Sequence, residues 1–261
     1  MNDVGGALGD LREAVERWPL WTRLAWQDVA LRYRRSIIGP FWLTLSMGIM
    51  VVALTIVYGD IFNIALNDFL PYLTAGLLVW GLIQACISEG CQTFIEGEWI
   101  IKQINIPLLM FPLRVVCRNL IIFIHNLVIY LIVLAVFPVP VGWSILAAFP
   151  GVVLILINGV WLATLLGMLS ARFRDLPQIV ASILQIAFFV TPVIWRTDLI
   201  SKKSIVLANP FYYFLEIVRG PLLGQSPAVS TWIVVLVITF AGLLATSVLY
   251  YLRRSRVAFW V

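Results

Sequence analysis

Charged residues are scarce in this sequence: only 12% of its 261 residues are Asp, Glu, Lys or Arg, whereas 62% are hydrophobic. Soluble domains typically carry about 25% charged residues. The mean hydropathy of +0.99 therefore favours a polytopic membrane protein. The net charge of +5 is divided among short clusters between apolar runs, so we expect no basic face for nucleic acid.

Motifs for catalysis and energy coupling are also absent. The sequence contains no P-loop, no nucleophile elbow, no zinc-protease motif and no pair of carboxylates inside an apolar run. The three cysteines, Cys86, Cys91 and Cys117, lack metal-ligand spacing, and we expect them to be small buried hydrophobic residues. We therefore expect no catalytic residue, no metal site and no cofactor in this chain. Residues 1–36 lack a short apolar core, so no cleavable signal peptide is expected either.

Six apolar segments approach the roughly 20 residues that a membrane-crossing helix needs. They comprise residues 37–58, 70–88, 111–137, 145–170, 179–195 and 231–252. Five contain no charged residue, and the third contains Arg114 and Arg118 near its start and His125 further on. The sequence therefore predicts an all-α polytopic membrane protein. A six-span domain at 37–252 lies between a cytoplasmic N-terminal segment at 1–36 and a cytoplasmic tail at 253–261.

The distribution of Lys and Arg predicts the orientation. Fourteen Lys and Arg residues lie in four segments: the N-terminal segment, the stretch entering the third span, the connection after the fourth span and the C-terminal tail. The connections after the first and third spans contain none, and the connection after the fifth contains four. Because cytoplasmic connections carry the excess of basic residues, both termini are predicted to be cytoplasmic.

Residues 18–35, WPLWTRLAWQDVALRYRR, are typical of an amphipathic helix at the water–lipid boundary. Arg32, Arg34 and Arg35 would meet anionic lipid head groups, and Gln27 and Asp28 interrupt the apolar face. A plain juxtamembrane anchor is the alternative. The following Gly39-Pro40 falls in the first turn of the first span, where the missing N–H of proline costs little.

Two further segments are too polar or too short to span a membrane. EGCQTFIEGEWIIKQINIPLLMFP, from residue 89, needs the membrane, the underside of the bundle or a partner protein to cover its apolar side. NPFYYFLEIVRGPLLG, residues 209–224, suggests a short re-entrant or interfacial helix between the fifth and sixth spans, and an ordinary amphipathic loop helix is the alternative. Glu216 and Arg219 are spaced to pair on one helical face.

Three segments in this order, LRYRRSIIGPFW, ARFRDLPQIVASILQIAFFVTPVIW and NPFYYFLEIVRGPLLG, resemble the ABC-2 type permeases that export polysaccharides and polyol phosphates. This group includes O-antigen, capsule and teichoic acid transporters. The resemblance covers about residues 20–260, and the basic-aromatic tail LRRSRVAFWV belongs to it. Pro40 departs from the family pattern, in which a bulky residue is common.

The resemblance implies a homodimeric membrane subunit that moves a lipid-linked glycan across the bacterial inner membrane. Two separate nucleotide-binding subunits would bind ATP and Mg and dock on the cytoplasmic side. The candidate contacts with these subunits are Glu96, Glu98, Trp99, Lys102, Arg32, Arg34 and Arg35. The periplasmic re-entrant segment would include Asn209, Pro210, Glu216 and Arg219.

Aromatic side chains would suit the sliding path of a sugar polymer, because they offer platforms without deep pockets. The candidates are Trp80, Phe188, Phe189, Trp195, Tyr212 and Tyr213, and membrane-interface belts or packing are the alternative roles. Three other functions remain open. The first is an ABC-2 permease for a drug or a lipid, the second is a proton-coupled carrier that uses His125, and the third is an intramembrane enzyme acting on lipid-linked sugars.

Overall fold

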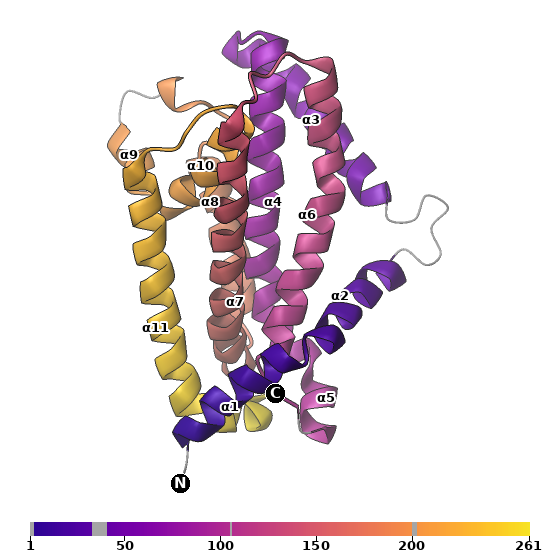
Figure 1. Cartoon of the computed structure of the whole chain (residues 1–261), viewed down its shortest axis with the longest axis vertical. Coiled ribbons are helices and arrows are strands. Elements are labelled where there is room, and N and C mark those ends of the chain that lie inside the picture. The colour runs from indigo at the N-terminus through magenta and orange to yellow at the C-terminus, as the bar shows by residue number, and fades with distance from the viewer. Residues whose placement is uncertain (1–2, 33–40, 105, 200–202) are drawn as a thin grey trace.

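The computed structural model describes residues 3–32, 41–104, 106–199 and 203–261, and the regular elements in these ranges are all helical. Figure 1 shows long helices that run between an upper and a lower end of the molecule. These helices are α4 (Leu66–Glu96), α6 (Met110–Val136), α7 (Ala148–Arg172) and α11 (Val229–Trp260), and α3 (Phe41–Phe62) lies beside the upper part of the bundle. The prediction of an all-α membrane protein is confirmed at this level.

Five helical segments of the described chain are long and apolar enough to cross a membrane. They are Thr44–Phe62, Leu66–Gln103, Met110–Val136, Trp143–Arg172 and Val229–Trp260. They correspond to predicted spans 1, 2, 3, 4 and 6. The start of the first predicted span, including Gly39-Pro40, lies outside the described residues.

The fifth predicted span, 179–195, is only partly helical. Helix α8 (Leu176–Val190) has 15 residues and rises about 22 Å, against a hydrocarbon core of about 30 Å. Pro192 explains this early end, because a residue before proline is disfavoured in the α conformation. Thr191 accordingly adopts the extended conformation, with φ −82° and ψ 138°. The six-span count therefore stays a prediction.

Shorter elements lie at the two ends of the bundle in Figure 1. At the lower end are α1 (Asp3–Glu16), α2 (Trp18–Arg32) and α5 (Glu98–Gln103), together with the end of α11. At the upper end are α9 (Lys203–Leu207) and α10 (Pro210–Leu222), and the 3-10 turns Trp143–Ala147 and Thr197–Leu199 complete the elements. Helices α1 and α11 thus bring the two parts of the chain nearest the termini to the same end. Residues 34 and 35 of the predicted boundary helix lie outside the described ranges.

Helix α4 is the centre of the bundle. In its most apolar window 72% of the residues are buried, against 11% in α3. It packs chiefly against α7 and α6. The burial explains why α4 is apolar on nearly every face along its upper two thirds, whereas α3 and α11 present apolar side chains outward, as lipid-facing helices do.

The segment after Glu89 folds against the underside of the bundle. Helix α4 continues through it to Glu96, and α5 follows directly. The two helices meet at Gly97, where a Cβ atom would lie 2.5 Å from the Phe111 ring, so only glycine fits. Ile100 and Ile101 pack on a buried cluster at the lower end formed by Phe94, Phe111, Met168, Ala171, Tyr250, Val257 and Val261. The bundle itself therefore covers this segment's apolar side.

Candidate functional site

A network of charged side chains joins the surface helix α2 to α4 and α6 at the lower end. Asp28 on α2 accepts hydrogen bonds from Arg114 Nε at 2.8 Å and from Arg118 Nη1 at 3.3 Å. Glu89 on α4 accepts from Arg118 Nη2 at 2.9 Å and from Asn119 Nδ2 at 2.8 Å. Arg118 therefore lies between two carboxylates that belong to different helices.

This ion network is largely hidden from solvent. The Arg118 side chain is 10% exposed and that of Asp28 is 15% exposed, and Arg32 adds a weaker contact with Glu89 at 3.5 Å. Charged groups in such a site are kept only when their partners are well placed. A displacement of α2 must therefore shift α4 and α6 or break these bonds.

The sequence pointed to part of this network. Arg114 and Arg118 stood out as charges in the first turns of a span, and Arg32 was a predicted contact residue. Asp28 and Glu89 were missed as their partners. The available signal was the position of Asp28, which interrupts an otherwise apolar face of α2 and thus needs a buried cation to face.

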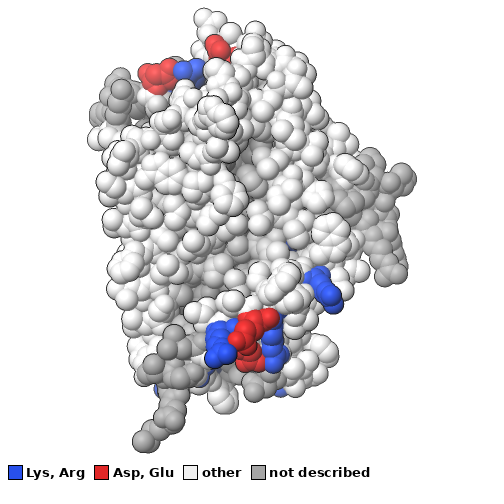
Figure 2. All heavy atoms as spheres, viewed as in Figure 1, with Lys and Arg blue, Asp and Glu red and all other residues white. Residues whose placement is uncertain are grey.

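The structure brings four of the predicted coupling residues together. Glu96, Glu98, Trp99 and Lys102 line one open groove of about 440 Å³ at the lower end. Lys102 Nζ lies 2.6 Å from Glu98 Oε1 on the exposed surface, and Trp99 is 66% exposed. On the face shown in Figure 2, charged side chains gather at the two ends of the molecule, and a white band separates them.

Two rows of uncharged polar side chains face outward within the apolar part of the bundle. On α8, Gln178, Ser182 and Gln185 are exposed, and their spacing puts them on one helical face. On α4, Gln84 is exposed, and Ser88 and Gln92 follow it at intervals of four residues and are partly exposed. Such groups are costly against lipid, so these rows are suited to water or to another protein.

An aromatic contact joins the two helices at the upper end of these rows. The Trp80 ring lies 5.7 Å from Phe188 and 5.5 Å from Phe211, between ring centroids. Trp80 is only 2% exposed, and its indole N–H donates to Gln84 Oε1 at 2.8 Å. Trp80 thus packs inside the chain and orients the first amide of the α4 row.

The other predicted path aromatics are divided between two places. Phe189 is 60% exposed on α8, and its carbonyl accepts a hydrogen bond from Trp195 Nε1 at 3.0 Å. Tyr212 and Tyr213 lie on α10 with ring centroids 5.3 Å apart. The Tyr213 hydroxyl donates to the Leu207 carbonyl at 2.8 Å, which fixes α10 to the end of α9. Their roles as a path stay predictions.

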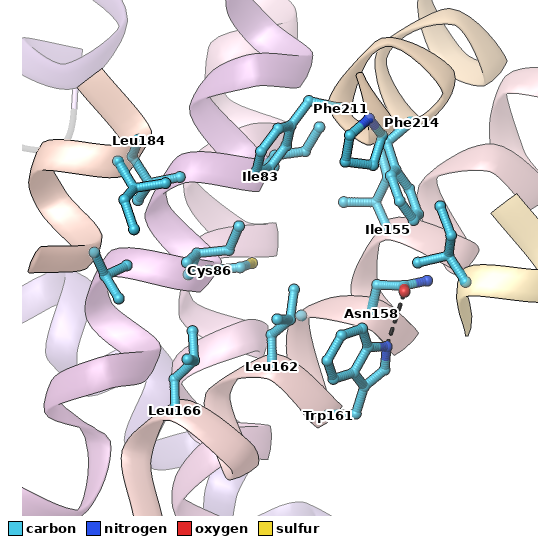
Figure 3. Close-up of a pocket in the computed structure, with 16 residues that line it drawn as sticks. Ile83, Cys86, Ile155, Asn158, Trp161, Leu162, Leu166, Leu184, Phe211 and Phe214 are labelled. Carbon is cyan, nitrogen blue, oxygen red and sulfur yellow. Dashed lines mark hydrogen bonds between the residues drawn. The ribbon is translucent and has the colours of Figure 1, made fainter. Parts of the chain in front are cut away.

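An apolar cavity of about 280 Å³ separates α8 from α7. Figure 3 shows Leu184 on one side of it, Ile155 and Leu162 on the other, and Phe211 and Phe214 above. Its lining residues come from α4, α7, α8, α10 and α11.

At the upper end, the start of α10 is fixed by a capping interaction. Asn209 Oδ1 accepts from the Phe211 N–H at 2.9 Å, and Asn209 Nδ2 donates to Thr191 Oγ1 at 2.8 Å. Pro210 occupies the first turn, where its missing N–H costs nothing. Asn209 thus links α10 to the residue at which α8 ends.

Arg219 connects the same two segments from inside the bundle. It is 2% exposed and donates to Glu216 Oε2 at 2.7 Å, the pairing that the sequence predicts, and to the Pro192 carbonyl at 2.5 Å. Its guanidinium lies 4.3 Å from the Tyr72 ring centroid, a cation–π contact with α4. Burial acts to lower the pKa of Arg219, but Tyr72 and Glu216 raise it above its ordinary value, so the charge is kept.

His125 is half-buried in α6. Its Nδ1 atom lies 2.8 Å from the Ile121 carbonyl one turn earlier, and its own carbonyl accepts from Thr44 Oγ1 at 3.3 Å. The contact with the Ile121 carbonyl fixes the orientation of the His125 ring on α6.

Comparisons with known proteins agree with this arrangement. A family model described as ABC-2 type transporter matches residues 19–223. The chain is 26% identical over 205 residues to an O-antigen export system permease protein RfbA from Myxococcus xanthus, covering 77% of this chain and 78% of that protein. It is 22% identical over 189 residues to an O-antigen export system permease protein RfbA from Klebsiella pneumoniae, covering 70% and 72% of the two chains.

Proposed function

This chain belongs to the ABC-2 type transporter family, and from that membership we propose that it is the membrane subunit of an ATP-driven exporter of a lipid-linked polysaccharide. The substrate class follows the O-antigen export permeases to which the chain is similar. Capsular polysaccharide and teichoic acid belong to the same chemical class. The proposed location is the bacterial inner membrane, with both termini in the cytoplasm and the lower end of Figure 1 facing it.

The observation that carries this proposal is the pair of polar rows on α4 and α8. Gln84, Gln178 and Gln185 offer hydrogen-bond donors and acceptors without charge, which suits a neutral hydroxyl-rich chain that must slide. In a second copy of this chain the same rows would face these, so that a dimer would enclose the path. The apolar remainder of α8, including Ile183 and Ile186, would face lipid or the partner copy.

The energy source is proposed to be separate. The sequence contains no P-loop with which this chain could bind ATP itself. Two nucleotide-binding subunits, which would hold ATP and Mg, are proposed to dock at the groove lined by Glu98, Trp99 and Lys102. The network around Arg118 would then pass their motion from α2 to the spanning helices.

Replacing Gln185 with Leu tests the path, because it removes the amide and keeps the side-chain size. We expect a several-fold loss of surface glycan in the native host and accumulation of lipid-linked glycan inside the cell. The matched control is Ile186→Leu, on the adjacent apolar face of the same helix, which should export normally. Normal export by Gln185→Leu would contradict the role of the α8 polar row as the glycan path. Normal surface glycan in a strain lacking this chain would contradict the proposed export function itself.

A further inference from the structure

A polar cavity of about 520 Å³ lies at the upper end of the molecule, away from the groove and the two polar rows. Five segments converge on it: the start of α4, the connection after α6, the turn after α8, helix α10 and the connection after α10. Its polar lining residues are Asn67, Asp68, Tyr72, Arg196, Thr197, Asp198, Tyr212, Glu216, Arg219 and Gln225. The function proposed above leaves this cavity without a role.

The floor of the cavity is fixed before any ligand arrives. The Tyr72 hydroxyl donates a hydrogen bond shared by the carbonyl oxygens of Pro192 and Trp195, at 3.2 and 3.0 Å. Arg219 is stacked on the Tyr72 ring and paired with Glu216, and its side chain is 3% exposed. Because these groups hold one another, they can present a constant hydrogen-bonding surface to a ligand.

The charges of the cavity favour a neutral ligand over an anion. Its two arginines already have carboxylate partners, since Arg196 lies 3.4 Å from Asp198 and Arg219 lies 2.7 Å from Glu216. Asp68 makes no ion pair with any residue of the described chain and is exposed at the rim. Three carboxylates against two guanidiniums would repel a phosphate or a carboxylate ligand.

The remaining chemistry suits hydroxyl groups. The Asp68 carboxylate can only accept, whereas the amides of Asn67 and Gln225 both donate and accept. The half-buried Tyr212 adds an apolar ring surface beside these groups. A cavity with carboxylate acceptors, amides and an aromatic wall can bind a polyhydroxylated ring, whose hydroxyls bond to the polar groups while its C–H face packs on the aromatic ring.

We propose that this cavity binds one neutral sugar unit of the exported chain as it leaves the membrane, with Asp68 accepting hydrogen bonds from its hydroxyls. The identity of the ligand as a sugar rests on the proposed function, but the presence of a neutral polyol site rests on the cavity alone. A sugar held at this place would slow the return of the chain between ATPase strokes.

The test is saturation-transfer NMR on the purified chain in nanodiscs, with D-mannose, D-galactose, L-rhamnose and N-acetyl-D-glucosamine as separate probes. We expect at least one sugar to receive saturation from the wild-type chain. Asp68→Ala should weaken that binding about tenfold, the effect of losing one charge-assisted hydrogen bond. Asp60→Ala is the matched control, because Asp60 is an exposed acid in the last turn of α3 that does not line the cavity, and it should bind as wild type.

Three outcomes would overturn the proposal: no probe receives saturation, Asp68→Ala binds like the wild type, or inorganic phosphate competes with the sugar. If Asp68→Ala does not stay monodisperse, Gln225→Ala replaces it with an expected weakening of about fivefold, because its amide makes neutral hydrogen bonds. The measurement uses the isolated chain without ATPase or export. Its failure can therefore be told apart from failure of the export function, which is read from surface glycan.

Discussion

Arg118 has the most demanding surroundings of the charged residues at the lower end. It is nearly buried, and it forms ion pairs with two carboxylates, Asp28 and Glu89, that come from two other helices. An ionised group in such a place is stable only while its partners remain. The residue that couples α2 to the membrane helices is therefore also one on which their packing depends.

Replacing Arg118 with Ala is expected to destabilise the protein by about 3 kcal/mol, because Asp28 and Glu89 then lose a buried cation that compensates their negative charge. The measurement is the temperature at which half of the detergent-solubilised protein remains monodisperse. Arg12→Ala is the control, since the pair of Arg12 with Glu16 lies exposed on α1 and should leave that temperature unchanged. Equal midpoints for wild type and Arg118→Ala would show that the network carries little stability.

At the scale of elements, the packing of α4 against α7 depends on close approach of the two backbones. A Cβ atom at Gly90 would lie 2.8 Å from the Cα and Cβ atoms of Ala163, and one at Gly167 would lie 2.6 Å from a methyl carbon of Thr93. The Cα atom of Ala163 belongs to the backbone and its Cβ atom is bonded directly to it, so neither atom can move aside as the end of a flexible side chain does. Small residues at helix contacts are a common means of packing in membranes.

Gly90→Ala is therefore expected to cost about 1–3 kcal/mol by forcing α4 and α7 apart. Gly81→Ala provides a control in the same helix, where a Cβ atom would meet nothing within 4 Å. There the better helix propensity of alanine should leave stability unchanged or raise it by up to about 1 kcal/mol. The thermal midpoint should fall for Gly90→Ala and stay or rise for Gly81→Ala, and a fall of equal size in both variants would contradict the close-packing account.

At the scale of the whole molecule, the two ends differ in what they offer a partner. The lower end presents the groove around Trp99 beside the network that reaches α2, α4 and α6. The upper end presents Trp143, which is 90% exposed, and this end contacts the spanning helix α4 through the buried Arg219, whose guanidinium lies 4.3 Å from the Tyr72 ring centroid. If the proposed ATPase subunits dock at the lower end, the ion pairs of Arg118 with Asp28 and Glu89 give their motion a direct route to α4 and α6.

Trp99→Ala is expected to weaken association with the ATPase subunit by about 2 kcal/mol, or roughly 30-fold in Kd, as for a tryptophan at the centre of an interface. Trp143→Ala, which removes an exposed tryptophan from the opposite end, should have no effect. The measurement is a mild-detergent pull-down of the tagged chain, with the recovered P-loop ATPase quantified by mass spectrometry. Equal recovery with Trp99→Ala would move the docking surface away from this groove.

The sequence by itself determined the class of the protein and the outline of its bundle. Apolar runs and the positions of Lys and Arg are local properties of the chain, and the cost of placing each residue in lipid is set mainly by its own chemistry. Five of the six predicted spans correspond to long apolar helices for this reason. The early end of α8 was also readable, from Pro192, although the sequence interpretation extended that span to residue 195.

Only the tertiary structure decided which polar groups meet. Asp28 lies 86 residues from Arg114 and Glu89 lies 29 residues from Arg118, and no local pattern links them. The same is true of Trp80, whose burial depends on α8 and α10 closing over α4. Hydrophobicity selects the helices, but their contacts depend on the shapes of surfaces that are far apart in the sequence, and these surfaces exist only after packing.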